Sequence, residues 1–224
     1  MRQERAQQTH RTLLRAAATE FDRHGYAGTS LARVSQSAGV TMGALTFHFP
    51  SKAALADAVR AQATALTRAA VARTSGADGQ PGAGVAELLD TLTRLLEEEP
   101  SVRAAARLTW EQPESAGNWH AGWSPDLRDR LARERAVGAG TGTGLDDTVP
   151  DSTGPDGARP DSTGPDGADL EVLAHCLVVG AEALRRGVVT LDGDDPAERA
   201  EVHQRLGRLW RRAVAGPPAP GAPR

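Results

Sequence analysis

The clearest pattern of apolar and polar positions lies between residues 29 and 52, with the sequence TSLARVSQSAGVTMGALTFHFPSK. Its first part predicts a short helix with one apolar face, because apolar residues recur at helical spacing, at Leu31, Val34 and Ala38. Gly39 predicts the end of that helix, since glycine adopts the left-handed conformation at little cost. A second short helix is predicted from Met42 to about Phe47. Two short helices around a glycine turn form the helix-turn-helix plan, whose second helix enters the major groove of DNA.

Hydroxyl side chains stand where helices are expected to begin. Thr29 or Ser30 precedes the first helix, and Thr41 precedes the second. Such side chains accept hydrogen bonds from the free N–H groups of a first helical turn. Pro50 predicts a stop, and Ser51 then caps a longer helix that carries the chain away from the helix-turn-helix.

Helical periodicity covers most of the remaining chain. Further helices are expected at residues 9–24, 51–73, 85–97, 101–112, 124–137, 169–189 and 196–215. The predicted fold is therefore all-α. A three-helix DNA-binding domain at residues 1–50, with a flexible arm at 1–8, precedes a second helical domain at 51–215, whose expected roles in ligand binding and dimerisation rest on the resemblance and the helix faces described below.

Two segments lack any helical pattern. Residues 138–168 contain a tandem ten-residue repeat, PDSTGPDGAR followed by PDSTGPDGAD, at 150–169. Segments so rich in Gly, Pro, Asp and Ser cannot bury a core, so we expect a disordered loop there and a disordered tail at 216–224.

The charge is unevenly distributed along the chain. The whole sequence carries a net charge of −3, but residues 1–60 hold eight basic and four acidic residues, a net of +4 that leaves −7 for the rest. A basic head on an acidic body is typical of a soluble nucleic-acid-binding regulator, although charge alone also fits a solvated face. A polar N-terminus and the lack of an 18-residue apolar run predict a cytoplasmic protein without a membrane partner.

Catalytic and metal-binding chemistry find no support in the sequence. The six histidines are scattered, without zinc spacing, and no nucleophile-elbow, phosphate-loop or dinucleotide motif occurs. The single cysteine, Cys176, lies among apolar residues of a predicted helix and is expected to be an inert buried thiol. We therefore expect no enzyme, no metal and no cofactor. A protein-interaction module without DNA binding is the remaining alternative.

From Arg11 to Lys52 the chain resembles the TetR family of bacterial regulators. The residues that carry the resemblance include Leu14, Phe21, Gly25, Tyr26, Thr29, Val34, Ala38, Gly39, Val40, Gly43, Leu45, Phe47, His48, Phe49, Ser51, Lys52 and Leu55. One position departs from the family pattern: the tyrosine usual two residues before the histidine, which commonly touches a DNA phosphate, is Thr46 here.

The expected DNA contacts fall into two groups. Base edges should meet the predicted second helix through Met42, Ala44, Leu45 and Thr46, with Gly43 allowing close approach. Phosphates should be held by Thr29, Arg33, Thr41, His48 and Lys52. Because the base-facing set is largely apolar, readout should depend on thymine methyl groups and DNA shape.

A narrower resemblance concerns a ligand. The segments GALTFHFPSKAALADAV, VRAAARLTWEQ and WSPDLRDRLARERAVG are similar to the γ-butyrolactone autoregulator receptors, in which a tryptophan lines the pocket for a lactone or butenolide. Trp123 matches that position best, with Trp119 as the next candidate and Trp110 nearby. An aromatic cluster of this kind also fits a plain hydrophobic core. An antibiotic or other apolar effector, or a receptor-like protein without a lactone ligand, remains the alternative.

A homodimer is expected as well. The last two predicted helices have wide apolar faces and small residues that permit close approach, although the same faces also suit the monomer's own core. One short reading helix covers only a half-site, so a palindromic operator requires two copies of the chain.

Overall fold

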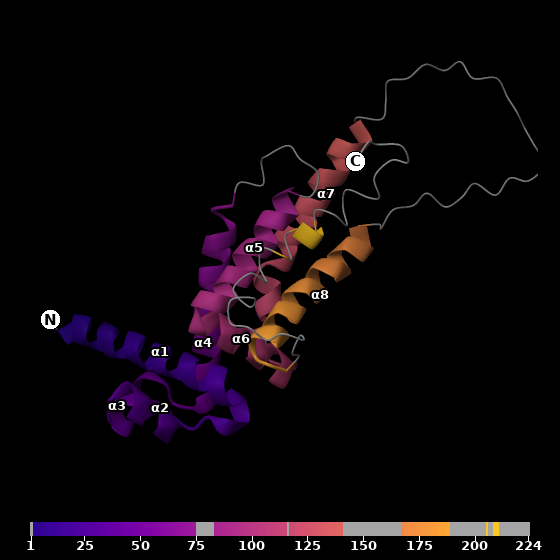
Figure 1. Ribbon diagram of the computed structural model, residues 1–224. Coiled ribbons are helices and arrows are strands. Elements are labelled where there is room, and N and C mark those ends of the chain that lie inside the picture. The colour runs from indigo at the N-terminus through magenta and orange to yellow at the C-terminus, as the bar shows by residue number, and fades with distance from the viewer. Residues whose placement is uncertain are drawn as a thin grey trace, which may run out of the picture.

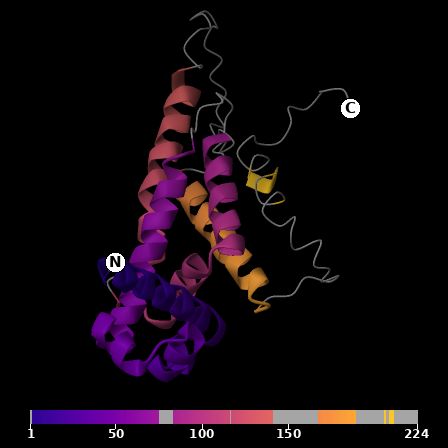
Figure 2. The same cartoon turned by 90° about the vertical axis from the view of Figure 1, so that its left-hand side faces the viewer.

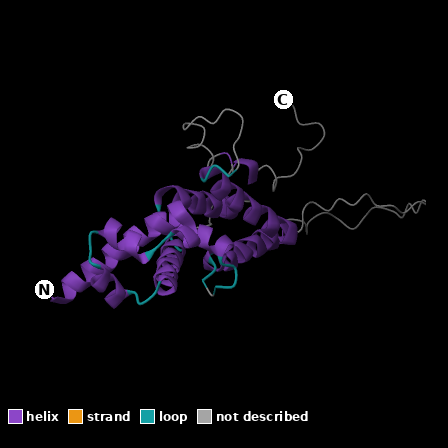
Figure 3. Ribbon diagram, turned by 90° about the horizontal axis from the view of Figure 1, so that it is seen from below, coloured by secondary structure: helices purple, strands orange, loops and turns teal. Residues whose placement is uncertain are grey.

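The computed structural model describes residues 2–74, 83–115, 117–140, 167–188, 205 and 208–210, and these are helical or lie in short connections (Figures 1 and 3). The elements in chain order are α1 Arg2–Gly28, α2 Leu31–Ala38, α3 Met42–His48, α4 Lys52–Val71, α5 Ala83–Glu98, α6 Pro100–Glu111, the 3-10 helix η1 Trp119–Gly122, α7 Ser124–Gly140 and α8 Gly167–Arg185. We call α1–α3 the head and α4–α8 the body. Every element of the described residues is a helix, which confirms the predicted all-α fold. Figures 1 and 2 both show the head at one end of the body.

Side-chain caps fix the helix boundaries of the head. The hydroxyls of Ser30, Thr41 and Ser51 each accept a hydrogen bond from the backbone N–H three residues later, at 3.1–3.2 Å. Gly39 ends α2 in the left-handed conformation, with φ of 66°. Because caps and turn residues act over a few positions, the sequence was sufficient to predict them.

The first helix differs from the prediction at both ends. Residues 2–8, expected to be a flexible arm, form the first turns of α1. The helix is interrupted at Gly25, where φ is 68° and ψ is −176°, and one further turn follows before α2. The predicted stop at Gly25 is therefore a kink rather than the end of the element.

The body follows the predicted helices with shifted ends. The helix expected at 101–112 already includes Pro100, and Ser101 is buried in its first turn. Helices α7 and α8 reach into both ends of the predicted loop 138–168, while the tandem repeat and most of the predicted helix 196–215 lie outside the described residues. Cys176, expected to be buried, is exposed on α8.

Two apolar cores hold the molecule together. The body core contains the buried tryptophans Trp119, Trp123 and Trp210 among leucines of α5 and α7. The head core gathers residues of α1, α2 and α3, and it also includes Ala104 and Leu108 of α6. Since fully buried body residues complete the head core, the head is packed firmly on α6.

Polar contacts reinforce the same junction. The carboxylate of Asp22 on α1 binds Arg103 Nε of α6 at 2.7 Å and Arg185 Nη2 of α8 at 3.0 Å. The backbone N–H of Tyr26 donates to Glu111 Oε2 of α6 at 2.5 Å. The end of α1 is thus fixed to two helices of the body. None of the helices among the described residues is long and apolar enough to cross a membrane.

Candidate nucleic-acid interface and effector site

The outer surface of α3 presents side chains that no other part of the described chain covers. Phe47 is 83% exposed and Met42 is 41% exposed, which is unusual for large apolar residues of a folded domain. Gly43 and Thr46 are also exposed, and a Cβ added to Gly43 would meet nothing within 4 Å. Thr46 Oγ1 donates to Met42 O and Gly43 O, so this hydroxyl is held against its own helix. No other part of the described chain would block a DNA duplex from reaching this surface.

Leu45 does not belong to the exposed surface. Its side chain is 0% exposed and packs in the head core, so the expectation that Leu45 faces DNA bases is wrong. Helix α3 has apolar residues on more than one side, and only one side fits the core. Phe47, two residues further and therefore on the opposite side of the helix, takes the exposed position.

Thr29 is also unavailable to a phosphate through its side chain. It is 2% exposed, and its hydroxyl donates to the carbonyls of Gly25 at 2.7 Å and Glu20 at 3.1 Å. The hydroxyl therefore ties the kinked end of α1 to the start of α2. The expected phosphate contact of this side chain is replaced by a structural role.

Lys52 supports the head and still lies at the start of α4. Its ammonium donates to Tyr26 O at 2.8 Å and Thr29 O at 3.0 Å, and it stands 4.3 Å from the centroid of the Tyr26 ring. Because an ammonium has three N–H groups, one donor remains beyond these two bonds. A contact with phosphate through that donor stays a prediction.

The remaining expected phosphate contacts lie at the ends of α2 and α3. Thr41 is exposed and caps α3, while Arg33 is half-exposed, 3.9 Å from the carboxylate of Glu20. The ring of His48 packs against the rings of His10 and Phe49. Burial, and to a lesser extent the nearby His48, lower the pKa of His10.

Two of the three expected effector residues come together in the body core. Trp119 and Trp123 are buried with their rings 6.0 Å apart, whereas Trp110 is 51% exposed. The ring of His120 lies 5.6–5.8 Å from all three, and that of His175 lies 4.6 Å from Trp123. Nothing in the sequence pattern singled out these two histidines. Burial, together with the charge of His175, lowers the pKa of His120.

The indole N–H groups of the three tryptophans have different partners. Trp119 donates to Thr67 Oγ1 of α4 at 2.9 Å, and Trp110 donates to Glu182 Oε2 of α8 at 3.2 Å. Trp123 Nε1 is buried and has no hydrogen-bond partner among the described residues. Such a donor costs free energy until an acceptor reaches it.

Comparison with known proteins places the head in a family. Residues 13–59 match the bacterial regulatory proteins of the tetR family. The chain carries a tetR-family DNA-binding domain. The matched residues run from the middle of α1 into α4, so they include the whole helix-turn-helix and its exposed α3.

A curated protein that resembles part of this chain is a receptor protein. The A-factor receptor protein of Streptomyces griseus is 44% identical over 63 residues, which are 28% of this chain and 23% of that protein. The chain thus spans about a quarter of the length of the curated relatives it matches.

Solved structures resemble the chain over most of its length. A tetR regulator from Streptomyces fradiae is 29% identical, with a TM-score of 0.56 over 95% of this chain and 89% of its own. A gamma-butyrolactone receptor, ArpA-like, is 26% identical, with a TM-score of 0.55 over 92% and 98%. The likeness to the tetR-family fold therefore extends from the head through the body.

Proposed function

We propose that this protein is a ligand-responsive transcriptional repressor that binds a palindromic operator as a homodimer and is released by a small molecule. The observation that carries the proposal is the uncovered surface of α3 in a head that matches the tetR family. A domain gains nothing in stability from leaving Phe47 and Met42 in water, so an exposed pair on this helix indicates a partner.

DNA readout would use the exposed residues of α3. Phe47 and Met42 would contact thymine methyl groups, and Gly43 would admit the helix close to the floor of the major groove. Arg33, Thr41, His48 and the free donor of Lys52 would bind phosphates on either side. Since none of the base-facing side chains makes bidentate hydrogen bonds, DNA shape would contribute strongly to specificity.

The dimer would form through α8 and the segment that follows it. Val172 and Cys176 are exposed on α8, four residues apart and hence on one side of the helix. Two-fold symmetry would hold the two copies of α3 about 34–36 Å apart, one turn of DNA.

Selection of bound duplexes from a random DNA pool tests the DNA-binding part. The expected product is a palindrome with half-sites centred about 10–10.5 base pairs apart. An enriched site without two-fold symmetry would refute the dimer but not the DNA binding. No enrichment at low salt would refute the DNA binding itself.

The effector is proposed to be a γ-butyrolactone or butenolide. Support comes from the similarity to a gamma-butyrolactone receptor and to the A-factor receptor protein, and from the unpartnered N–H of Trp123. An antibiotic or other apolar molecule is the second candidate, because the cluster of aromatic side chains around Trp123 would suit many ring systems.

Release from DNA would pass through α4. The indole of Trp119 is hydrogen-bonded to Thr67 of α4, and α4 begins at the edge of the head. A ligand beside Trp123 would displace Trp119 and tilt α4, provided that it binds the tilted form more tightly. Titration of the operator complex with a synthetic γ-butyrolactone tests this step. Release at a stoichiometric concentration is expected, and a complex that persists at saturating lactone would refute the lactone assignment.

A further inference from the structure

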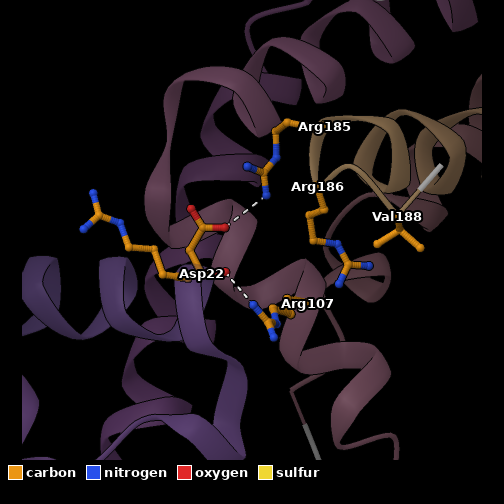
Figure 4. A pocket seen from close by; sticks show the side chains of 6 residues that line it. Asp22, Arg107, Arg185, Arg186 and Val188 are labelled. Atoms are coloured by element: carbon orange, nitrogen blue, oxygen red, sulfur yellow. Dashed lines mark hydrogen bonds and ion pairs between the residues drawn. The ribbon is translucent and has the colours of Figure 1, made fainter. Parts of the chain in front are cut away.

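A charged cleft of about 410 Å³ lies where the end of α1 meets α6 and the end of α8 (Figure 4). Its lining consists of Asp22, Arg23, Arg107, Arg185, Arg186 and Val188. Four of these six residues carry a guanidinium group and one carries a carboxylate. Neither the DNA contacts nor the effector site uses this concentration of positive charge.

The backbone at the end of α8 holds two of the arginines in place. Gly187 adopts φ of 68°, its N–H donates to Leu184 O, and the N–H of Val188 donates to Ala183 O. This is the hydrogen-bond pattern of a Schellman motif, which satisfies the last carbonyl groups of a helix. Two carbonyl groups at the end of α8, which would otherwise repel an anion, are therefore already hydrogen-bonded. The arginine side chains supply the donors at this end of the cleft.

The arginines are oriented by acidic groups and still have N–H groups to offer. Arg107 binds Glu111 through Nε at 2.6 Å and donates to the backbone carbonyl of Asp22 through Nη1 at 2.8 Å. The next two arginines each have one acidic partner. Arg185 uses Nη2 for the Asp22 carboxylate, and Arg186 uses Nε for Glu182, 3.1 Å away.

No described residue accepts a hydrogen bond from the remaining terminal N–H groups of these three arginines. Arg185 Nε is in addition buried without a hydrogen-bond partner. Arginines held in place by some of their N–H groups present the others as donors in a fixed geometry. That arrangement fits an oxyanion with several acceptor oxygens.

The charge balance points the same way. The carboxylates of Glu111, Asp22 and Glu182 pair with Arg107, Arg185 and Arg186, and burial raises the pKa of Glu182. Arg23 has no ion pair among the described residues. A net positive charge in a partly enclosed cleft attracts a small anion more strongly than the same charge on an open surface.

We propose that this cleft binds a phosphate group, carried by inorganic phosphate or by a small phosphorylated molecule. Guanidinium forks match the geometry of phosphate oxygens, and charge-assisted bonds of this kind are roughly twice as strong as neutral ones. A volume of about 410 Å³ also exceeds what one phosphate needs. The cleft therefore has room for an organic portion beside the phosphate.

Calorimetric titration of the full chain, without DNA or lactone, tests the proposal. Inorganic phosphate and adenosine monophosphate serve as separate probes, in buffer whose ionic strength is held constant with sodium chloride. Saturable binding of at least one probe is expected, and the tighter probe identifies whether the organic portion contributes. Lack of saturable binding by either probe would overturn the proposal, and because no DNA is present it would leave the proposed repressor function untouched.

Three variants locate the site. Arg186→Gln should weaken phosphate binding at least tenfold, whereas Arg94→Gln, which removes the same charge from an exposed position of α5, should change it less than twofold. Arg186→Lys keeps the charge and the pair with Glu182 but loses the fork, so it should weaken binding about threefold even if Arg186→Gln fails to fold. Equal losses in Arg186→Gln and Arg94→Gln, or unchanged binding in a folded Arg186→Lys, would place the phosphate elsewhere and overturn the proposal.

Discussion

Replacing Gly25 by alanine should lower the free energy of unfolding by about 2–4 kcal/mol, from backbone strain and the loss of a hydrogen bond to a carboxylate. Gly25 has φ of 68° and ψ of −176°, a region that is essentially restricted to glycine. Forcing alanine into it costs roughly 1–3 kcal/mol. This part of the penalty follows from the backbone alone.

The second part of the penalty comes from the packing of α1 on α6. A Cβ at position 25 would overlap Glu111 Oε1 and lie 2.6 Å from Oε2 and 2.7 Å from Arg107 Nη2. The Glu111 carboxylate must then move away from the backbone N–H of Tyr26, which it accepts at 2.5 Å. Losing that bond costs about 1 kcal/mol, because water reaches the freed N–H.

Urea unfolding followed by circular dichroism measures the effect. Gly180→Ala is the matched control, since Gly180 lies within α8 and its added Cβ would meet nothing within 4 Å. That variant should gain roughly 0.5–1 kcal/mol, the usual advantage of alanine over glycine in a helix. If Gly25→Ala unfolds at the same urea concentration as the wild type, neither the glycine-specific backbone at position 25 nor the hydrogen bond from Tyr26 to Glu111 of α6 contributes the proposed stability.

Three further outcomes are expected. Asp22→Asn should destabilise the protein by roughly 1.5–3 kcal/mol at neutral pH, because Arg103 and Arg185 lose their shared carboxylate, and a thermal melt unchanged from the wild type would contradict this. Trp123→Phe should preserve operator affinity and weaken the binding of a synthetic γ-butyrolactone about 3–10-fold in a calorimetric titration, because one hydrogen bond is lost. Unchanged lactone affinity would show that the indole N–H does not bind the lactone. Since the pKa of His120 is lowered in the folded protein from its ordinary value of 6.5, the unfolded chain takes up this proton first, and His120 reduces stability as pH falls below about 6.5. His120→Gln should therefore lose less stability than the wild type between pH 7 and pH 5 in chemical denaturation, and parallel losses would refute that assignment.

Local signals in the sequence were sufficient for the helix-turn-helix. The caps at Ser30, Thr41 and Ser51 and the turn at Gly39 each depend on residues within a few positions, so their structure follows from their chemistry. The direction of Leu45 could not be predicted in the same way. Helix α3 is too short for its periodicity to distinguish an inward leucine from an outward phenylalanine, and the packing of α1 and α4 decides between them.

Long-range contacts account for the other differences. Thr29 was expected to bind a DNA phosphate, but its hydroxyl donates a hydrogen bond to the carbonyl of Glu20, nine residues earlier. The ion pair between Asp22 and Arg185 joins residues 163 positions apart. No spacing or composition signal connects such residues, so both the junction of head and body and the arginine-lined cleft became visible only in three dimensions.

Operator binding by Thr46→Glu tests the central claim most directly, because it places one negative charge in the middle of the exposed surface of α3. Its control is Gln62→Glu, which makes the same charge change at an exposed position of α4 away from the head. Fluorescence anisotropy with the selected palindrome measures both affinities at one salt concentration. The account predicts at least a hundredfold loss for Thr46→Glu and less than a threefold change for Gln62→Glu. A folded Thr46→Glu protein that binds the operator as tightly as the wild type would contradict it.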